Sequence, residues 1–561
     1  MKQIIECVPN FSEGRDMNII KQITDVIERV DGVMLLDVDP GKDTNRTVVT
    51  FAGEPEPVME AAVACIAKAK ELIDMTKHSG AHPRMGATDV CPLVPVSNIT
   101  MEECVELAKE LGKRINDATG IPVYLYGEAA QRRDRYNLPD IRKGEYEALE
   151  EKLRDPDFAP DFGKPVFLPK SGATNVSARA FMLAYNINLN TKDLKAAKDI
   201  AMTIRSSGRA ERDSNGDIVR DAEGKIVKIP GKLKFCQAGG WYIEEYGYAQ
   251  ITMNLHRFNI TGLHTAFDTV VKEAAKMGLR VTGSELIGLA PLRAMLDAGE
   301  HYLKLQGAST ACPEKDIIHC AVRSLGLEDT SPFDPQKRIV EYALKNEKGQ
   351  LKHLTVNDFT DLLSSNAPAP GGGSVAALNA ALAAGLTAMV ANLTFENKNY
   401  KDVRETMEKA GREAQCLKAR ALSLIDADTA AFNTWMDAMR LPKKTDDDKA
   451  KRDAAIQDAV LNAIDIPHKT LKLCPDILKL AEYVLKKGNQ NALSDAAVAV
   501  KQTQAAAWGA YYNILINLPS LDDQKKCEHI KKAAKKTLDI VETKAAKLTL
   551  FAEETLTHAI G

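Results

Sequence analysis

The sequence has almost no net charge, and this absence limits what the protein can bind. Its 561 residues include 74 Lys plus Arg and 77 Asp plus Glu, which leaves a formal charge of -3. So close a balance gives no long-range field that would hold the chain on nucleic acid or on an anionic membrane. We therefore expect no nucleic-acid and no membrane partner. The expected partner is a small molecule, and an anionic ligand must be held by a local cluster of charge.

Closely spaced cysteine pairs are also missing. The 10 cysteines are scattered through apolar segments, with no C-x-x-C pair and no zinc-finger spacing. Such scatter is typical of free, buried thiols in a reducing compartment. The segment Met1 to Glu6 puts a carboxylate where a signal peptide has its apolar core, so we read no export signal. A cytoplasmic location is predicted.

Membrane, nucleotide and metal motifs are absent as well. The apolar run Ser374 to Leu393 contains Asn, Gly and Thr and is better interpreted as a buried helix than as a membrane span. The glycine run Pro370 to Ser374 lacks the lysine of a Walker loop and the strand and spacing of a dinucleotide fingerprint. His78 and His82 have a helical zinc spacing, but the glycine between them and Pro83 break the helix. We predict no metal and no nucleotide cofactor.

The length corresponds to about three to five domains, and the hydrophobic periodicity indicates what they are. Residues 2–126 predict a β-α-β-β-α-β core, the split βαβ order of ferredoxin-like domains, with the helices on one face of a mixed sheet. A similar pattern recurs over 178–307. The predicted strands are 4–8, 33–37, 46–51, 89–96, 122–126, 178–189, 240–244, 248–255 and 279–289, and the helices are 16–30, 57–75, 102–115, 193–206 and 263–277.

Two segments interrupt these units. Residues 157–172 contain three prolines and two glycines and form a predicted loop, and loops of this length usually bind something. Residues 207–230 carry two Asn-Gly or Glu-Gly turn signals and predict a hairpin extension.

After about residue 330 the strand signal disappears, which predicts a separate all-α domain. The helices expected there are 358–364, 375–393, 400–439, 446–473, 475–487, 494–518 and 522–557. The boundary is predicted in the polar segment 346–350. The predicted domains are therefore 1–177, 178–330 and 356–561, with a linker at 331–355.

Two loops of the first unit carry reactive side chains. Residues 77–89 place two His, Arg84 and an Asp in a glycine-broken loop that leads into a strand. For His82, a catalytic role and a hydrogen-bonded polar turn are about equally supported by the residues alone. Residues 36–46, with Asp39 and Arg46, could orient a charged amino-acid substrate, although a solvated hairpin turn is the favoured alternative for that segment alone.

The helical half offers a glycine run and a pair of acids. Residues 370–374 predict a helix N-terminus with free backbone N–H groups, suited to a carboxylate or to close helix packing. Asp426 and Asp428 lie two positions apart on a predicted helix and so face different sides. A desolvated carboxylate there would have a raised pKa, as a general acid near neutral pH requires, and the alternative is an ordinary, partly exposed helix acid.

Taken together, these stretches resemble the bifunctional formimidoyltransferase-cyclodeaminase family of histidine degradation. The resemblance covers nearly the whole chain. The carrying segments are ECVPNFSEGRD at 6–16, DPGKDTNRTVVTFAG at 39–53, HSGAHPRMGATDVCPLVPV at 78–96, PDFGKPVFLPKSGAT at 160–174, GWYIEE at 240–245, APGGGSVAALNAALAAGLTAMVANLT at 369–394, LIDADTAAF at 424–432, AMRLPK at 438–443 and AYYNILINL at 510–518.

The resemblance implies two reactions and a set of residues for the first. The first half would move the formimino group of N-formimino-L-glutamate to N5 of tetrahydrofolate, with His82 transferring the protons. Folate, as a polyglutamylated co-substrate, would contact a loop and one glycine, with Lys232 and Lys234 beside them; Asp39, Arg46 and Arg84 are weaker candidates. The folate residues are Gly163, Lys164, Pro165, Val166, Phe167, Leu168, Pro169, Lys170, Ser171, Gly172 and Gly231.

For the second half, the resemblance implies that 5-formiminotetrahydrofolate closes to 5,10-methenyltetrahydrofolate with release of ammonia. Asp428 falls on the acid position, and Asp426 is the weaker candidate. The resemblance also implies a homo-oligomer. An alternative is a methenyltetrahydrofolate cyclohydrolase-like helical domain with a degenerate transferase half, and a non-enzymatic scaffold is the third hypothesis. The excursion 207–230 is longer than the resemblance implies and lies immediately before Gly231.

Overall fold

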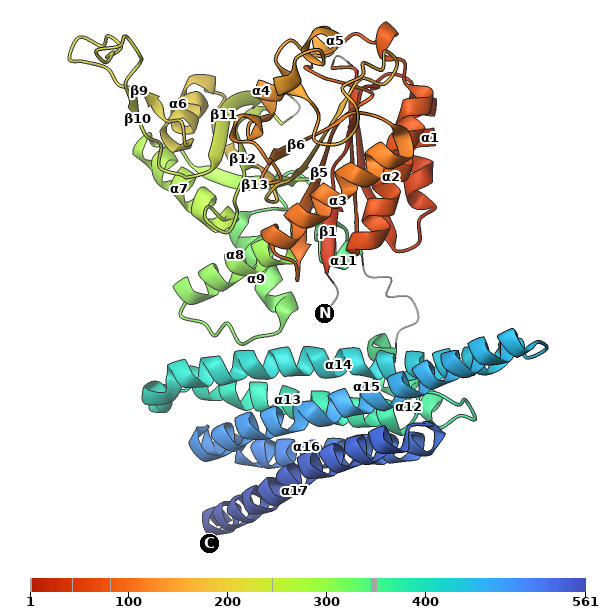
Figure 1. The fold of residues 1–561 in the computed structure, drawn as a ribbon. Helices are drawn as coiled ribbons and strands as arrows, with labels where there is room; N and C mark the ends of the chain where they lie inside the picture. The colour runs from red at the N-terminus through yellow and green to blue at the C-terminus, as the bar shows by residue number, and fades with distance from the viewer. Residues whose placement is uncertain (1–2, 43, 81, 245, 345–350, 561) are drawn as a thin grey trace. The chain divides into compact units, whose positions relative to one another are not determined.

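The computed structural model describes residues 3–42, 44–80, 82–244, 246–344 and 351–560. The fold is multidomain, with an N-terminal α/β region and a C-terminal helical region (Figure 1). It divides into two compact units, residues 1–301 with 318–346, and residues 302–317 with 347–561. The predicted boundary at 346–350 lies outside the described residues.

The first sheet has seven strands in the order β1-β4-β2-β5-β7-β6, with β3 paired to β4 and β1 also paired to β5. Its core order is β3-β4-β1-β5, all antiparallel, and β7 is parallel to both β5 and β6. The strands are β1 (Ile4–Cys7), β2 (Asn10–Phe11), β3 (Val33–Gly41), β4 (Arg46–Gly53), β5 (Thr88–Ser97), β6 (Val123–Gly127) and β7 (Thr174–Ala178).

Three helices cover one face of this sheet, as their apolar stripes predict. The helices α1 (Met17–Glu28), α2 (Pro55–Leu72) and α3 (Met101–Thr119) form a continuous core with the strands. A capping box between Thr100 and Glu103 fixes the start of α3. The prediction of helices on one face only was incomplete, because the short helices α4 (Leu138–Arg142) and α5 (Leu149–Lys152) pack on the opposite face, against Tyr124 and Tyr126.

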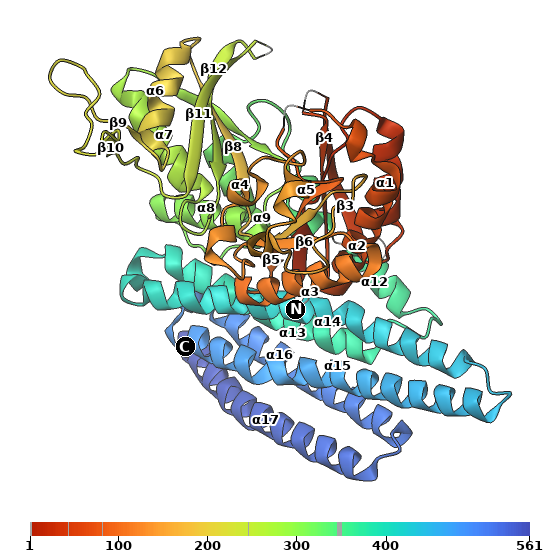
Figure 2. The same ribbon diagram turned by 45° about the horizontal axis from the view of Figure 1, so that its top comes forward.

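The second sheet has the order β11-β12-β8-β13, and all its pairs are antiparallel. Its strands are β8 (Leu183–Leu189), β11 (Cys236–Ile243), β12 (Tyr248–Leu255) and β13 (Val281–Ile287). Figure 2 shows α6 (Leu194–Ile204) and α7 (Leu263–Lys276) alongside these strands. The predicted single strand 178–189 was wrong: Ala178 ends β7 in the first sheet, and β8 starts the second.

The excursion 207–230 leaves the second sheet through a short hairpin stem, β9 (Arg209–Ala210) with β10 (Lys228–Ile229). Its tip differs from the predicted hairpin, because residues 212–219 and 220–227 repeat the pattern R-D-x-x-G-x-I-V. In each repeat an Asp side chain accepts two backbone N–H groups, from Asn215 and Asp217 and from Glu223 and Lys225. Backbone bonds among positions 211, 219 and 227 close the tip on itself.

Four further helices follow the second sheet: α8 (Leu292–Leu305), α9 (Glu314–Leu325), α10 (Pro335–Arg338) and α11 (Val340–Ala343). The last two, of four residues each, lie within the predicted linker 331–355. The segment 302–317 belongs to the helical unit. There Ser309 Oγ donates to Asn392 Oδ1 at 2.8 Å, and Thr310 N donates to Glu408 Oε1 at 3.1 Å.

The helical unit is a bundle of long helices that lie side by side (Figure 1). Its helices are α12 (Val356–Leu363), α13 (Gly372–Glu396), α14 (Arg404–Arg440), α15 (Asp446–Lys487), α16 (Leu493–Asn517) and α17 (Gln524–Ile560). Among the described residues, α13 alone is long and apolar enough to cross a membrane, and 61% of its most apolar window is buried in the bundle.

The break predicted before Pro475 was wrong, because α15 continues through both Pro467 and Pro475. A proline inside a helix costs about 3 kcal/mol, since it removes one hydrogen bond and crowds the preceding turn. Leu471, Cys474 and Ile477 are fully buried in the same core as α14 and α16. This packing stabilises the continuous helix against the local cost of the prolines.

Candidate active sites

His82 lies in the loop between α2 and β5, and its ring has a defined tautomer. Nδ1 is 2.7 Å from the carbonyl oxygen of Pro83, so Nδ1 carries the proton that it donates. Nε2 is then left with a lone pair. Partial burial lowers the pKa of His82, the charge of Arg46 lowers it further, and the Pro83 carbonyl and Asp89 act in the opposite direction. A neutral imidazole with a free Nε2 is suited to act as a base.

Three charged side chains surround this histidine. Asp89, on β5, is fully buried and accepts Arg142 Nε at 3.2 Å and Met85 N at 3.1 Å. Burial raises the pKa of Asp89, while Arg142 and Arg46 hold it down. Arg46, at the start of β4, has a buried Nε without a hydrogen-bond partner among the described residues. Its Nε is therefore a donor that the described residues leave unused.

His78 and Arg84 have a structural role in the same loop. His78 Nε2 lies 2.8 Å from Asn45 O, and Arg84 Nε donates to His78 Nδ1 at 3.2 Å. Arg84 is buried and forms ion pairs with Glu145 at 3.0 Å and Glu147 at 2.7 Å. These contacts occupy most of the guanidinium donors, so the geometry offers Arg84 as a support of the loop rather than as a ligand of substrate.

The predicted folate loop, 163–172, reaches the His82 loop at its C-terminal end. Ala87 N donates to Ser171 O at 2.8 Å, and Gly86 and Gly172 form an antiparallel bridge. A Cβ at Gly86 would lie 2.4 Å from Ser171 O, so no side chain fits there. Residues 163–166, which include Lys164, are exposed, and so is Lys170. The structure therefore brings one end of this loop beside the histidine and leaves the other end open.

The other predicted folate residues lie on the second sheet's side of the same unit. Gly231 packs against the end of α6, where a Cβ would lie 1.8 Å from Arg205 O, so its glycine has a steric cause. Lys232 is tied to Glu273 at 2.5 Å, whereas Lys234 is exposed. Asp39, one of the weaker candidates, is an exposed residue of β3 in the first sheet. In the strand pairing it lies opposite Val48 on β4, the strand that begins at Arg46.

A cavity of about 690 Å³ lies between the two sheets. Tyr126 and Arg179 line it from the first sheet's side, and Phe235, His256 and Arg257 from the second. Burial raises the pKa of the Tyr126 hydroxyl, the charges of Arg179 and Arg142 lower it, and Asp89 acts in the same direction as burial. Across the cavity, Arg257 pairs with Glu128 at 3.0 Å. The cavity is large enough for a small molecule with a ring system.

Asp428, on α14, lines a second cavity of about 330 Å³ at the start of α13. Ser374 Oγ donates to Asp428 Oδ2 at 3.1 Å. Burial raises the pKa of Asp428, and hydrogen bonds from the Ser374 side chain and backbone act against this rise. A Cβ at Gly373 would lie 2.1 Å from Asp428 Oδ1, so the glycine lets the helix start approach the carboxylate. The glycine run and the acid form one site.

Asp426 faces another side of the same helix, as the two-residue spacing predicts. Its Oδ1 accepts Leu351 N at 2.6 Å, and its Oδ2 is buried without a hydrogen-bond partner among the described residues. Asp426 therefore caps a backbone turn outside the cavity. Within the described ranges, no group of three or more His, Cys, Asp and Glu could hold a metal ion.

Comparison with known proteins assigns the chain to a family. Family models match residues 4–179 (formiminotransferase domain, N-terminal subdomain), 184–345 (formiminotransferase domain) and 355–536 (formiminotransferase-cyclodeaminase). A formimidoyltransferase-cyclodeaminase of Sus scrofa is 41% identical over 549 residues, which are 97% of this chain and 98% of that protein. The chain belongs to the formiminotransferase-cyclodeaminase family.

Two further relatives each match one part of the chain. A glutamate formimidoyltransferase of Streptococcus pyogenes is 42% identical over 306 residues, 54% of this chain and 95% of that protein. A methenyltetrahydrofolate cyclohydrolase of Methylorubrum extorquens is 40% identical over 174 residues, 31% of this chain and 84% of that protein.

Sequence reasoning missed several residues of these sites. Arg142, which pairs with the buried Asp89, was not singled out, because it lies more than 50 positions away in a polar segment without periodicity. Asn513 lines the Asp428 cavity from α16. Its segment, 510–518, carries the family resemblance but no motif that marks Asn513 as a site residue. A polar residue in a long apolar helix is the signal that could have identified it.

Proposed function

We propose that this protein is a bifunctional folate enzyme of histidine degradation. It transfers the formimino group of N-formimino-L-glutamate to N5 of tetrahydrofolate, and it then cyclises 5-formiminotetrahydrofolate to 5,10-methenyltetrahydrofolate with release of ammonia. The observation that carries this proposal is the orientation of His82, whose Nδ1 is held by Pro83 O at 2.7 Å and whose Nε2 makes no hydrogen bond within the described residues and can act as a base. Family membership over nearly the full length agrees with it.

In the transfer step, His82 moves one proton. Attack of N5 on the amidine carbon gives a tetrahedral adduct, in which N5 must lose a proton and the departing glutamate nitrogen must gain one. Nε2 can take the first proton and deliver it to the second site. Arg46, with its unpartnered buried Nε, can hold a carboxylate of the formiminoglutamate.

In the closure step, Asp428 acts as the acid. N10 attacks the carbon of the protonated formimino group, whose nitrogen becomes an amino group and must gain one more proton before it departs as ammonia. The raised pKa keeps a fraction of Asp428 protonated near neutral pH, and the carboxylate left behind can accept the N10 proton. Asp426 is committed to the backbone of Leu351, so it has no part in this step.

The folate would lie between the loop 163–172 and the cavity of about 690 Å³. We place a polyglutamylated tail near the exposed Lys164, Lys170 and Lys234, since Lys232 is neutralised by Glu273. No nucleotide or metal enters either step of this proposal.

Architecture and assembly form part of the same proposal. The orders β3-β4-β1-β5 and β11-β12-β8-β13 both support two ferredoxin-like βαββαβ subdomains, 1–177 and 178–330, ahead of a helical domain, 356–561. We place the enzyme in the cytoplasm as a homo-oligomer. The support for association is an exposed apolar stripe on α13, formed by Leu382, Met389 and Leu393.

Two variants test the division of labour. His82→Ala should abolish transfer and leave closure of supplied 5-formiminotetrahydrofolate intact, and Asp428→Ala should do the reverse. Purified protein given formiminoglutamate and tetrahydrofolate should develop methenyl absorbance in the near ultraviolet. Loss of both activities in both folded variants would contradict the assignment.

The cyclohydrolase alternative is disfavoured. Its degenerate transferase half does not agree with the match to a glutamate formimidoyltransferase over 306 residues, 95% of that protein. Hydrolysis of methenyltetrahydrofolate without any transfer activity is the result that would favour it.

A further inference from the structure

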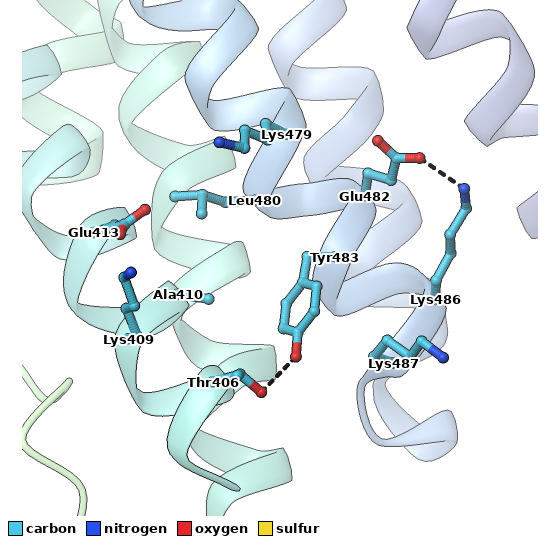
Figure 3. Close-up of a pocket in the computed structure, with 10 residues that line it drawn as sticks. All are labelled: Thr406, Lys409, Ala410, Glu413, Lys479, Leu480, Glu482, Tyr483, Lys486 and Lys487. Atoms are coloured by element: carbon cyan, nitrogen blue, oxygen red, sulfur yellow. Dashed lines mark hydrogen bonds and ion pairs between the residues drawn. The ribbon is translucent and has the colours of Figure 1, made fainter. Parts of the chain in front are cut away.

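A groove between α14 and α15 lies apart from the Asp428 site of the same helical unit (Figure 3). Its volume is about 480 Å³. Ala410, Leu480 and the ring of Tyr483 give it an apolar floor, and the Tyr483 hydroxyl donates to Thr406 Oγ1 at 2.5 Å. Along α14, the groove residue nearest to Asp428 is Glu413, about 22 Å away at 1.5 Å per residue. The groove is therefore a separate feature of the bundle.

The charge of the groove is positive once its internal pairs are removed. Four lysines and two glutamates line it. Glu482 is neutralised by Lys486 at 2.6 Å and by Lys544, from α17, at 2.7 Å. The remaining charged residues make no ion pair within the part of the chain that the structure describes; these are Lys409, Lys479, Lys487 and Glu413. Three positive charges against one negative charge leave two in excess.

The arrangement of these groups is better suited to binding a ligand than to forming a row of ion pairs on the surface. Figure 3 shows Lys409 from α14 and Lys479 from α15 reaching toward the same end of the groove, where Glu413 also lies. Ion pairs on neighbouring turns are made elsewhere on α15, for example Lys469 with Asp465 at 2.6 Å. Here Lys409 and Lys479 stand over an apolar floor without such partners among the described residues, so a dianion with a short apolar body would complement both features.

We propose that this groove binds a glutamate unit, with its two carboxylates on Lys409 and Lys479. The inference rests on the proposed function, because both proposed substrates carry that unit: N-formimino-L-glutamate releases it as free glutamate, and tetrahydrofolate ends in it. Lys409 and Lys479 supply one positive charge for each carboxylate. The methylene groups between them lie over the apolar floor.

Glu413 distinguishes the two sources of a glutamate unit. Free glutamate carries an ammonium group, which Glu413 can accept beside the lysines. In folate the same nitrogen is acylated and uncharged, so Glu413 would only repel the nearby carboxylates. A bound folate end and a bound free glutamate therefore respond oppositely to removal of this negative charge.

The test is isothermal titration of the full-length protein with two probes, L-glutamate and p-aminobenzoyl-L-glutamate. Lys409→Met/Lys479→Met should weaken binding of at least one probe about tenfold or more, because it removes both carboxylate partners. The matched control, Lys472→Met/Lys501→Met, removes two exposed lysines outside the groove and should leave both affinities unchanged. Glu413→Gln should weaken the binding of L-glutamate or strengthen that of p-aminobenzoyl-L-glutamate, whichever probe uses the groove.

Transfer and closure rates of the same proteins separate this inference from the proposed function. An inactive unchanged chain would refute the proposed function. Equal affinities of the unchanged chain and the groove variant for both probes would overturn the inference while both activities remain. An equal loss in the control variant, or no response to Glu413→Gln, would overturn it as well.

Discussion

Glu6 is a buried carboxylate in the first strand, and its ionisation affects stability. Burial raises its pKa from 4.5 to about 7, and the charge of Arg179 opposes this rise. At a pH between 4.5 and about 7, Glu6 in the folded chain holds a proton that it has lost in the unfolded chain. The contribution of Glu6 to the free energy of unfolding is therefore present below pH 4.5 and is lost as pH rises through about 7.

Glu6→Gln should remove this pH dependence. We expect the variant to gain stability relative to the unchanged protein as pH rises from 5 to 8, by up to about 3 kcal/mol. Thermal unfolding midpoints of both proteins across this range measure the effect. Parallel curves would show that Glu6 ionises as freely in the folded chain as in the unfolded one.

Ser374 sets the protonation of the proposed closure acid. Its hydroxyl and backbone N–H lower the pKa of Asp428 against the effect of burial. Closure requires the protonated acid, so its rate should fall as pH rises through this pKa. Ser374→Ala removes the hydroxyl bond and should move the falling limb to higher pH.

The measurement for Ser374→Ala is the pH profile of kcat with supplied 5-formiminotetrahydrofolate. Ser423→Ala is the matched control, because Ser423 lies on α14 and, among the described residues, its hydroxyl donates to the carbonyl of Arg420 alone. An unshifted limb in Ser374→Ala, with a reduced rate at every pH, would assign Ser374 to packing alone.

At the scale of the element, the bridge between the His82 loop and the loop 163–172 can be broken at one position. Gly86→Ala would place a Cβ 2.4 Å from the carbonyl oxygens of Ser171 and Ala173. The two loops must then separate, which should lower kcat/KM for transfer about tenfold to a hundredfold and leave closure unchanged. Steady-state kinetics of both reactions provide the readout.

A glycine with free space supplies the control for that variant. A Cβ at Gly239 meets only Thr252, at 3.7 Å. Gly239→Ala should therefore keep both activities. If Gly86→Ala transfers as fast as the unchanged protein, the end of the loop does not position folate.

The strands and helices could largely be predicted because alternating and 3.6-residue apolar periods are local signals. The predicted strand 178–189 failed where the signal is not local. Ala178 and Leu183 are both apolar, and no turn residue separates them, so the pattern does not show that they belong to different sheets. The helix break predicted before Pro475 was wrong for a related reason, since burial of its neighbours outweighs the tendency of proline to end a helix.

At the scale of the whole molecule, the exposed stripe of α13 should decide assembly. Leu382, Met389 and Leu393 are 48%, 38% and 42% exposed on one face of a helix that is otherwise a core element. Leu382→Gln/Met389→Gln should lower the sedimentation coefficient, because the apolar area that favours association is reduced. Analytical ultracentrifugation measures this change.

Leu550→Gln, on α17, is the control for assembly, since Leu550 is 59% exposed and lies on another helix. It should sediment as the unchanged protein does. The same coefficient for all three proteins would place the contact between copies elsewhere.

The sites could be predicted only as far as each lay within one stretch of sequence. His82 and Asp428 stand in recognisable segments, and Arg46 follows a dense group of charges. The pairing of Asp89 with Arg142, the closure of the loop 163–172 on Gly86 and the contact of Ser374 with Asp428 all join residues about 50 or more positions apart. Such contacts depend on how the elements pack, which one sequence does not display.

The segment 302–317 affects how the chain can be divided. It is continuous with the transferase part in sequence, yet it supplies hydrogen-bond partners to Asn392 and Glu408 of the bundle, and Ala311 fills the space beside Gly411. A gene fragment that begins at residue 351 would encode every long helix and still omit part of the bundle's surface layer. The sequence pattern indicates one domain boundary, at 346–350. The folded bundle, however, includes residues on both sides of that boundary.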